Sequence, residues 1–126
     1  MSRTASLVIG AAANGLLVLL GRSVASAQDP AVVNAKTVRV ELDNDRVRVL
    51  EAVLEPGEKE QLHSHPASVL HVISGGRIRN HGADGKTAEI ELTTGETSYR
   101  EPTTHWAENI GTTTIHLILV ELKNPT

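Results

Sequence analysis

The sequence contains no cysteine and no phenylalanine, and its only aromatic residues are Tyr99 and Trp106. Without cysteine no disulfide can stabilise the chain, and a core without Phe must be built from Val, Ile and Leu. Proteins that bind single-stranded nucleic acid use several aromatic rings in a basic groove, whereas this chain has a formal net charge of -3. We therefore expect no nucleic-acid partner.

Several common catalytic signatures are also missing. The sequence has no cysteine nucleophile, no Gly-rich phosphate loop that opens a helix, and no Gly-x-Ser-x-Gly elbow. The 126 residues suffice for one domain, and 40% hydrophobic with 21% charged residues is typical of a packed globular protein. One fold must therefore carry the function.

Residues 1–27 differ from the rest of the chain. They contain no acidic side chain, and after Arg3 they are uncharged over residues 4–21. They end in Ala25-Ser26-Ala27, which matches the small-x-small pattern of signal peptidase sites, so we predict a signal peptide that is cleaved after Ala27 and export to the periplasm or the medium. The alternative is an uncleaved membrane anchor, because 18 uncharged residues reach the lower limit for a membrane span.

The chain that remains after this cleavage is acidic. Loss of residues 1–27 removes Arg3 and Arg22 and no acid, so the 99 residues from Gln28 onward carry 10 basic and 15 acidic side chains. This balance predicts no stable association with an anionic membrane once the signal is gone.

From residue 36 onward the apolar residues recur with period two, which is typical of half-buried strands. Turn signals separate the alternating segments at short intervals. The pattern predicts about eight short strands and no helix beyond the N-terminal segment, so residues 37–123 form an all-β barrel domain and residues 28–36 a flexible or strand-swapping lead-in. The alternating sets include Val38, Val40 and Leu42, and the turns include Pro56-Gly57, Asp84-Gly85 and Thr94-Gly95.

Two segments are apolar at nearly every position. These are residues 69–73 and 115–120, interrupted only by His71 and His116. Such runs are typical of strands that are covered on both faces. In a chain this small, a second copy of the protein is the natural cover, so we expect a homodimer.

The histidines indicate a metal site. In His63-Ser64-His65 the two imidazoles are two positions apart and point to the same face of a strand, and His105 can complete a set of three from another strand. Imidazole binds divalent iron, zinc, copper, nickel and manganese, and three protein ligands leave positions open for a ligand. Taken without further context, the His-x-His pair is better explained by two surface or half-buried histidines.

The surroundings of these histidines resemble the two motifs of the cupin family. This resemblance covers residues 38–122 and implies a double-stranded β-helix, or jelly-roll barrel, with a metal on His63, His65 and His105. The family's glutamate position is occupied by Ser68, and only two residues separate His65 from it. The first motif matches at Gly57, His63, His65 and Gly75, and the second at Gly95, Pro102, His105 and Asn109.

The resemblance also implies a chemistry. Cupins with three histidines and no carboxylate include thiol and diketone dioxygenases that use ferrous iron, so the resemblance favours one divalent ion, Fe(II) ahead of Zn, Mn, Ni or Cu. Three neutral imidazoles leave both charges on the ion, which favours anionic or chelating substrates. The resulting hypothesis is an exported metal-dependent enzyme acting on a small molecule, dioxygenase-like ahead of isomerase or lyase. The alternatives are a non-catalytic module that binds a small ligand or a metal, and a metal-free scaffold.

Further residues are candidates for supporting roles, each against the alternative of a solvated or core side chain. A polar group near the histidines can act as a fourth ligand or accept the spare ring N–H of a metal-bound histidine. Aromatic and cationic side chains can line the pocket. The first group comprises Gln61, Ser68, Glu101 and Glu108; the second comprises Tyr99, Trp106, Arg100 and His71.

Overall fold

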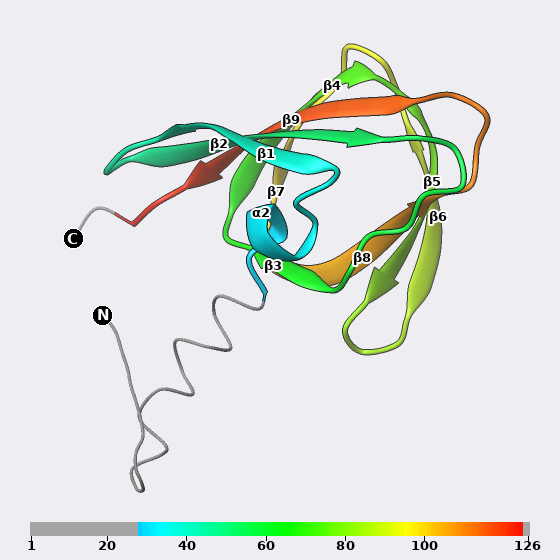
Figure 1. Cartoon of the computed structure of the whole chain (residues 1–126), viewed down its shortest axis with the longest axis horizontal. Coiled ribbons are helices and arrows are strands. Elements are labelled where there is room, and N and C mark those ends of the chain that lie inside the picture. Colours follow the sequence, from blue (N-terminus) through cyan, green and yellow to red (C-terminus); the bar gives the residue numbers. More distant parts are fainter. Residues whose placement is uncertain (1–27, 125–126) are drawn as a thin grey trace, which may run out of the picture.

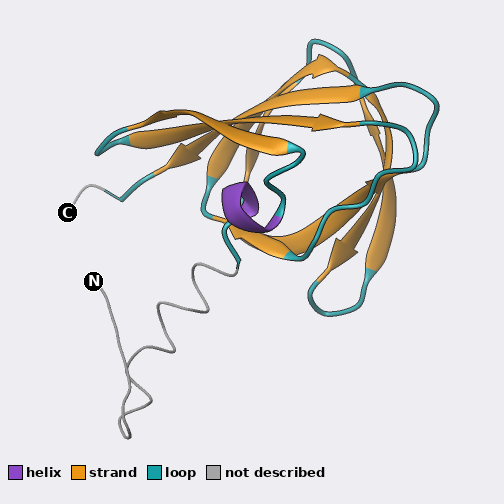
Figure 2. Cartoon of the chain, in the orientation of Figure 1, coloured by secondary structure: helices purple, strands orange, loops and turns teal. Residues whose placement is uncertain are grey.

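The computed structural model describes residues 28–124, so the predicted signal peptide lies outside the described residues. The described part contains nine strands and one short helix, and the all-β prediction is confirmed (Figure 2). Among these residues no helix is long and apolar enough to cross a membrane. The elements are α2 (Pro30–Val33), β1 (Val38–Asp43), β2 (Val47–Leu54), β3 (His63–His65), β4 (Ser68–Ser74), β5 (Gly76–Gly82), β6 (Thr87–Leu92), β7 (Thr97–Arg100), β8 (Thr103–Asn109) and β9 (Ile115–Leu122).

The strands form two antiparallel sheets. The five-stranded sheet has the order β1-β2-β9-β4-β7, and the four-stranded sheet has the order β3-β8-β5-β6. Figure 1 shows the two sheets facing each other around a common interior, with the β1–β2 hairpin and the end of β9 projecting beyond the second sheet. The last strand lies between β2 and β4, so segments far apart in the sequence are neighbours in the sheet.

The predicted turns are present where glycine permits them. Gly57, Gly85 and Gly95 have φ angles of 87°, 87° and 90°, the left-handed region that side chains with a Cβ rarely adopt. Gly75 serves a different purpose, because a Cβ there would lie 1.9 Å from the carbonyl oxygen of Leu92. These positions let short loops connect the strands without strain.

The core is aliphatic, as the lack of Phe requires. Leu54, Val72, Leu92 and Ile115 form a buried cluster inside the barrel. Each residue projects inward from its strand, and on β4 the alternation continues through Leu70 and Ser68. These inward-facing side chains give the barrel a rigid wall against which the candidate site is built.

The outward side of β4 is less covered than the apolar run predicts for a buried strand. Val69 is half-buried, His71 is exposed, and Ile73 is 43% exposed. Within a single chain this strand is therefore covered on its inner face only.

The structure corrects the prediction of no helix beyond the N-terminal segment, because the lead-in, residues 28–36, contains the single helical turn α2. Asp29 caps a single helical turn by accepting a hydrogen bond from the backbone N–H of Ala31, and Pro30 occupies the first helical position. Asp followed by Pro is a strong start signal for a helix. A single turn is too short to show the helical periodicity of apolar residues, so the pattern of the sequence did not predict it. The turn packs against β1 and β3, and Arg48 of β2 forms an ion pair with Asp29.

Candidate metal centre

Three histidines converge inside the barrel. His63 and His65 project from the same face of β3, and His105 lies directly opposite His63 in the antiparallel pairing of β3 with β8. One ring nitrogen from each lies within 4.8 Å of the others. The period-two interpretation of His-x-His therefore places both imidazoles correctly, and strand pairing brings in the third.

Each of these rings uses its Nδ1 atom for a hydrogen bond to an oxygen. Nδ1 of His63 donates to the backbone carbonyl of Gln61 at 2.7 Å, and Nδ1 of His65 donates to the carboxylate of Glu121 at 2.7 Å. Nδ1 of His105 donates to the side-chain oxygen of Asn80 at 2.5 Å. A neutral imidazole protonated on Nδ1 has its lone pair on Nε2, so the three rings offer three Nε2 lone pairs to one region. This donor set fits a divalent metal ion.

Burial keeps two of the rings neutral. It lowers the pKa of His63 to about 4. Burial, followed by the charges of His63 and His65, lowers the pKa of His105 to about 3. At neutral pH both rings are therefore uncharged, and Nε2 of each is ready to bind a metal.

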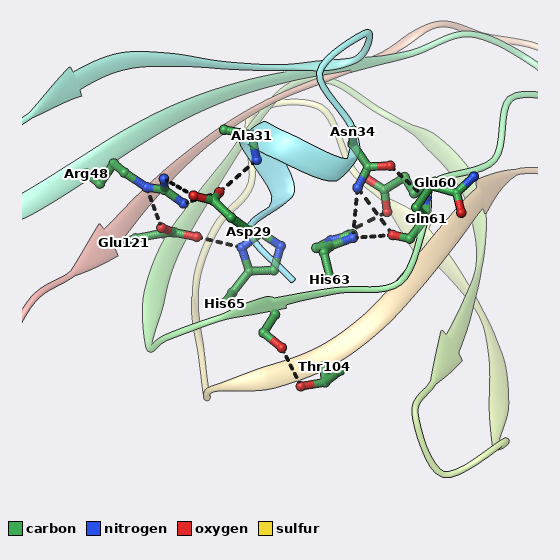
Figure 3. A network of polar contacts seen from close by, with 11 residues as sticks. Asp29, Ala31, Asn34, Arg48, Glu60, Gln61, His63, His65, Thr104 and Glu121 are labelled. Carbon is green, nitrogen blue, oxygen red and sulfur yellow. Dashed lines mark hydrogen bonds and ion pairs between the residues drawn. The ribbon is translucent and has the colours of Figure 1, made fainter. Parts of the chain in front are cut away.

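The orientation of His65 depends on a chain of charged groups (Figure 3). Glu121, which is 3% exposed, accepts from His65 with one oxygen and from Nε of Arg48 with the other, at 3.1 Å. Arg48 in turn donates to both carboxylate oxygens of Asp29, at 2.9 and 3.0 Å. The chain links a ring of the site to the cap of α2.

The carbonyl that accepts from His63 is positioned by Asn34, which ends the same helical turn. The buried Asn34 side chain accepts from the backbone N–H of Gln61 at 2.7 Å and donates to the backbone carbonyl of Gln61 at 3.2 Å. Its Nδ2 atom lies 3.0 Å from Nδ1 of His63 (Figure 3). The lead-in therefore fixes the loop that supplies the acceptor of His63.

The histidines line a cavity of about 370 Å³. This volume is in the range of sites for small molecules. Aliphatic residues form more than half of the wall, and polar side chains form the rest. Besides the three histidines, the polar residues of the lining are Glu60, Ser68, Asn80, Arg100, Glu101 and Thr103.

The predicted supporting residues divide into two groups. Ser68, Arg100 and Glu101 line the cavity, as a role near the site requires. Gln61 offers only its backbone, because it precedes β3 and the strand alternation does not extend to it. The prediction that Glu108 supports the site is wrong, because Glu108 faces outward and accepts from Nε2 of His81 at 2.9 Å.

Three residues predicted to line the pocket lie outside it. Tyr99 is 56% exposed on the outer face of β7, and His71 bonds to Thr97 on the same face. Trp106 stacks on His81 with ring centroids 3.7 Å apart. Trp106 directly follows His105 in β8, so the alternation of side chains places it on the opposite face. The pocket-lining prediction for Tyr99, Trp106 and His71 is therefore wrong.

Four important residues were missed by the sequence analysis: Asn34, Glu60, Asn80 and Glu121. Two of them carry a signal that could have been found, since Asn80 and Glu121 are polar residues at inward-facing positions of strands that are otherwise apolar inside. Asn34 and Glu60 lie outside the strands, so no periodicity predicts where they point. Burial raises the pKa of Glu60 to about 7.

Comparison with known proteins identifies the fold. No protein-family model matches the chain, and no curated protein matches it by sequence. Among solved structures, a cupin domain from Bordetella pertussis Tohama I has 27% identity and a TM-score of 0.63, covering 69% of this chain and 92% of that one.

Two further solved structures are similar to the chain and have the same fold. A protein with a double-stranded β-helix domain from Klebsiella pneumoniae has 24% identity and a TM-score of 0.53, covering 69% of this chain and 76% of that one. An RmlC-like cupin from Methanocaldococcus jannaschii has 21% identity and a TM-score of 0.54, covering 71% of this chain and 84% of that one. The chain has the cupin double-stranded β-helix fold.

Proposed function

We propose that this protein is an exported metal-dependent enzyme that acts on a small molecule inside the barrel, with one divalent ion held by His63, His65 and His105. The observation that carries this proposal is the common orientation of the three rings. Each donates its Nδ1 proton to a fixed oxygen, which leaves three Nε2 lone pairs free at one place in a cavity. Structural histidines have no need of three matched tautomers.

The chemistry would come from the ion together with its surroundings. A bound divalent ion supplies Lewis acidity and open positions for a ligand. The protein supplies the neutral imidazoles of His63 and His105, which bind without losing a proton, and a largely aliphatic wall that limits access of water. Fe(II) with dioxygenase-like chemistry is the favoured assignment, and Zn, Mn, Ni or Cu with isomerase or lyase chemistry is the alternative.

The character of the cavity supports a proposal for the class of substrate. Its volume suits a small molecule, and its aliphatic wall suits an apolar body. Arg100 in the lining places a positive charge near His105, and the ion adds more. Both favour a substrate that presents an anionic or chelating group to the metal.

Export remains part of this proposal. The Ala25-Ser26-Ala27 pattern supports it. Gln28, the first residue after the proposed cleavage, contacts the barrel through its carbonyl, which accepts from the backbone N–H of Ser64 at 2.8 Å. Intact-mass measurement on protein from a periplasmic extract of a bacterial host tests the cleavage. A mature chain that begins at Gln28 is expected, and a chain that keeps residues 1–27 in the membrane fraction would contradict it.

The metal site is tested by elemental mass spectrometry of the purified protein after reconstitution with Fe(II). The double variant His63→Ala, His105→Ala removes two proposed ligands, and His71→Ala, His116→Ala is its matched control because both of those histidines face outward. We expect about one ion per chain in the wild type and the control, and none in the ligand variant. A wild-type protein that retains no metal would overturn the proposal in favour of a metal-free scaffold.

Activity separates an enzyme from a binding module. If the retained metal is iron, oxygen consumption with small thiols and diketones is the first assay, and turnover lost in the ligand variant is the expected result. Retention of an organic ligand with no turnover would overturn the enzymatic assignment and favour the binding module.

A further inference from the structure

Glu60 is a buried carboxylate inside the cavity, beside the three histidines. Its Oε1 atom lies 3.8 Å from Nε2 of His63, the nitrogen that is free for a metal, and its side chain is 13% exposed. Figure 3 shows it next to His63. Glu60 belongs to the loop between β2 and β3, so it reaches the site from outside the sheets.

Hydrogen bonds to β8 hold both the backbone and the side chain of Glu60. Its N–H donates to the carbonyl of Ala107 at 2.9 Å, and its Oε1 accepts from the N–H of Ala107 at 3.0 Å. Lys59 forms an isolated bridge with Glu108 at the same place. The loop is therefore fastened to β8, the strand that carries His105, and the carboxylate has little freedom to leave the cavity.

The charge of Glu60 has no partner in the described part of the chain. No Lys or Arg side chain there forms an ion pair with it, and no donor among the described residues bonds to Oε2. Glu121, the other buried carboxylate of the site, contrasts with it because Arg48 balances its charge. A buried carboxylate is costly unless a cation neutralises it, and a divalent ion on the histidines is the cation within reach.

The distances allow direct coordination. Two ligand atoms that are each about 2.1 Å from one ion lie roughly 3.0 to 3.4 Å apart at octahedral or tetrahedral angles. The observed 3.8 Å between Oε1 and Nε2 of His63 exceeds this by less than 1 Å. A small rotation of the Glu60 side chain, whose Oε2 atom is free, covers that difference.

We propose that Glu60 is a fourth, anionic protein ligand of the metal ion, an inference that rests on the three-histidine site proposed above. Ser68 occupies the strand position at which the resemblance places a carboxylate, and Glu60 supplies that carboxylate from the loop instead. The ion then keeps one net positive charge rather than two. The site is a three-histidine, one-carboxylate centre whose carboxylate comes from an unusual place in the chain.

Cobalt(II) titration of the purified protein tests this assignment, because the visible absorption of Co(II) reports the number and type of its ligands. The test variant is Glu60→Gln, which keeps the size of the side chain and the oxygen that accepts from Ala107. The control is Glu91→Gln, which removes an exposed carboxylate that pairs with Arg77 away from the cavity. In Glu60→Gln we expect an altered Co(II) spectrum and affinity reduced by at least about tenfold, and in Glu91→Gln neither change.

The outcomes separate the two proposals. If the wild type binds no Co(II), the three-histidine site itself fails and Glu60 fails with it. If the wild type binds Co(II) and Glu60→Gln gives the same spectrum and affinity, only the role of Glu60 is overturned. Difference infrared spectra of the wild type provide a test that needs no variant: Co(II) binding is expected to shift a carboxylate stretching band, and an unshifted spectrum would overturn the assignment.

Discussion

The carboxylate of Glu121 accepts a hydrogen bond from Nδ1 of His65 at 2.7 Å, although the two residues lie 56 positions apart in the sequence. The bond connects β9 in one sheet to β3 in the other. It fixes the tautomer of the ring and adds negative charge behind a proposed metal ligand, which strengthens the ligand. The contact therefore joins the closure of the barrel to the chemistry of the site.

Glu121→Gln is expected to weaken metal binding by about 10- to 100-fold. The amide removes the negative charge behind His65 and leaves Arg48 with Asp29 as its remaining partner. Competition with a chelator of known affinity measures the change. Glu91→Gln, on an exposed ion pair with Arg77, is the control and should bind metal like the wild type. An unchanged affinity in Glu121→Gln would show that the hydrogen bond has no influence on the site.

Asn34→Ala is expected to lower the free energy of unfolding by about 1 to 3 kcal/mol. The substitution leaves the N–H of Gln61 without its acceptor and opens space beside the buried ring of His63. Urea unfolding measures the loss. Asn44→Ala is the matched control, since Asn44 makes its bonds in an exposed turn where water can replace them. Equal losses in the two variants would contradict a special role for Asn34.

The metal-free protein is expected to lose stability as the pH falls from about 6.5 towards 4. In the folded state His63 has a pKa of about 4 and His105 a pKa of about 3, both below the ordinary value of 6.5. Between these values the unfolded chain binds protons that the folded chain excludes, so stability rises with pH. Urea unfolding in the presence of a chelator measures it, and a free energy of unfolding that is constant over this range would contradict the shifts.

Glu60 has the opposite effect on how the stability of the metal-free protein depends on pH. Burial raises its pKa from 4.5 to about 7, so between these values the folded chain holds a proton that the unfolded chain releases, and stability falls as the pH rises. Two histidines outweigh one glutamate in the overlapping range. Glu60→Gln removes the opposing contribution, so the metal-free variant is expected to be more stable than the wild type above about pH 7. Glu91→Gln, at an exposed ion pair, is the control, and a Glu60→Gln variant no more stable than the wild type would contradict the shift.

Arg100→Met is expected to weaken the binding of small anions to the Co(II)-loaded protein by several-fold. The guanidinium lines the cavity and acts on His105 from within it, so its loss lowers the positive potential at the metal. Azide is a suitable probe because its binding changes the Co(II) spectrum. Arg77→Met removes a guanidinium from the outer face of β5 and should leave azide binding unaltered. Equal azide affinities in Arg100→Met and the wild type would remove Arg100 from the site.

The features of this structure that can be predicted from the sequence follow from the alternation of side chains along the strands. Alternation places His63 and His65 on one face of β3. The same rule places Trp106 on the face of β8 opposite to His105, so its position outside the cavity is predictable from the sequence. It fails where the chain leaves the strands. Glu60 and Gln61 lie in a loop anchored by hydrogen bonds to β8 and to Asn34, and such contacts depend on the folded barrel rather than on local pattern.

Register shifts between paired strands are a second reason why the sequence does not predict the direction of every side chain. The pairing of β1 with β2 shifts between Val40 and Leu42, and that of β4 with β9 shifts between Val72 and Ser74. A bulge of one residue reverses the facing of every later side chain in a strand. Val40 and Leu42 therefore face opposite sides of the sheet, although the sequence pattern groups them.

The outer face of the five-stranded sheet gives the expected homodimer a physical basis. A single register row crosses all five strands with apolar side chains only: Leu42, Val49, Val120, Val69 and Tyr99. Its ends are open, since Leu42 is 47% and Tyr99 is 56% exposed. Charged side chains occupy neighbouring positions of this sheet, where Arg39 forms an ion pair with Glu51, and the outer face of the other sheet carries ion pairs such as Arg79 with Glu89.

We expect a second copy of the chain to cover the apolar row, because a two-fold axis pairs such a row with itself. Val120→Lys places a charge at its centre on an outward-facing position, so the variant should fold and become monomeric. Sedimentation velocity of the wild type and the variant measures this. Glu91→Lys, on the outer face of the charged sheet, is the control and should sediment like the wild type. A wild-type protein that sediments as a monomer at micromolar concentrations would contradict the homodimer, and a dimeric Val120→Lys would place the interface on another surface.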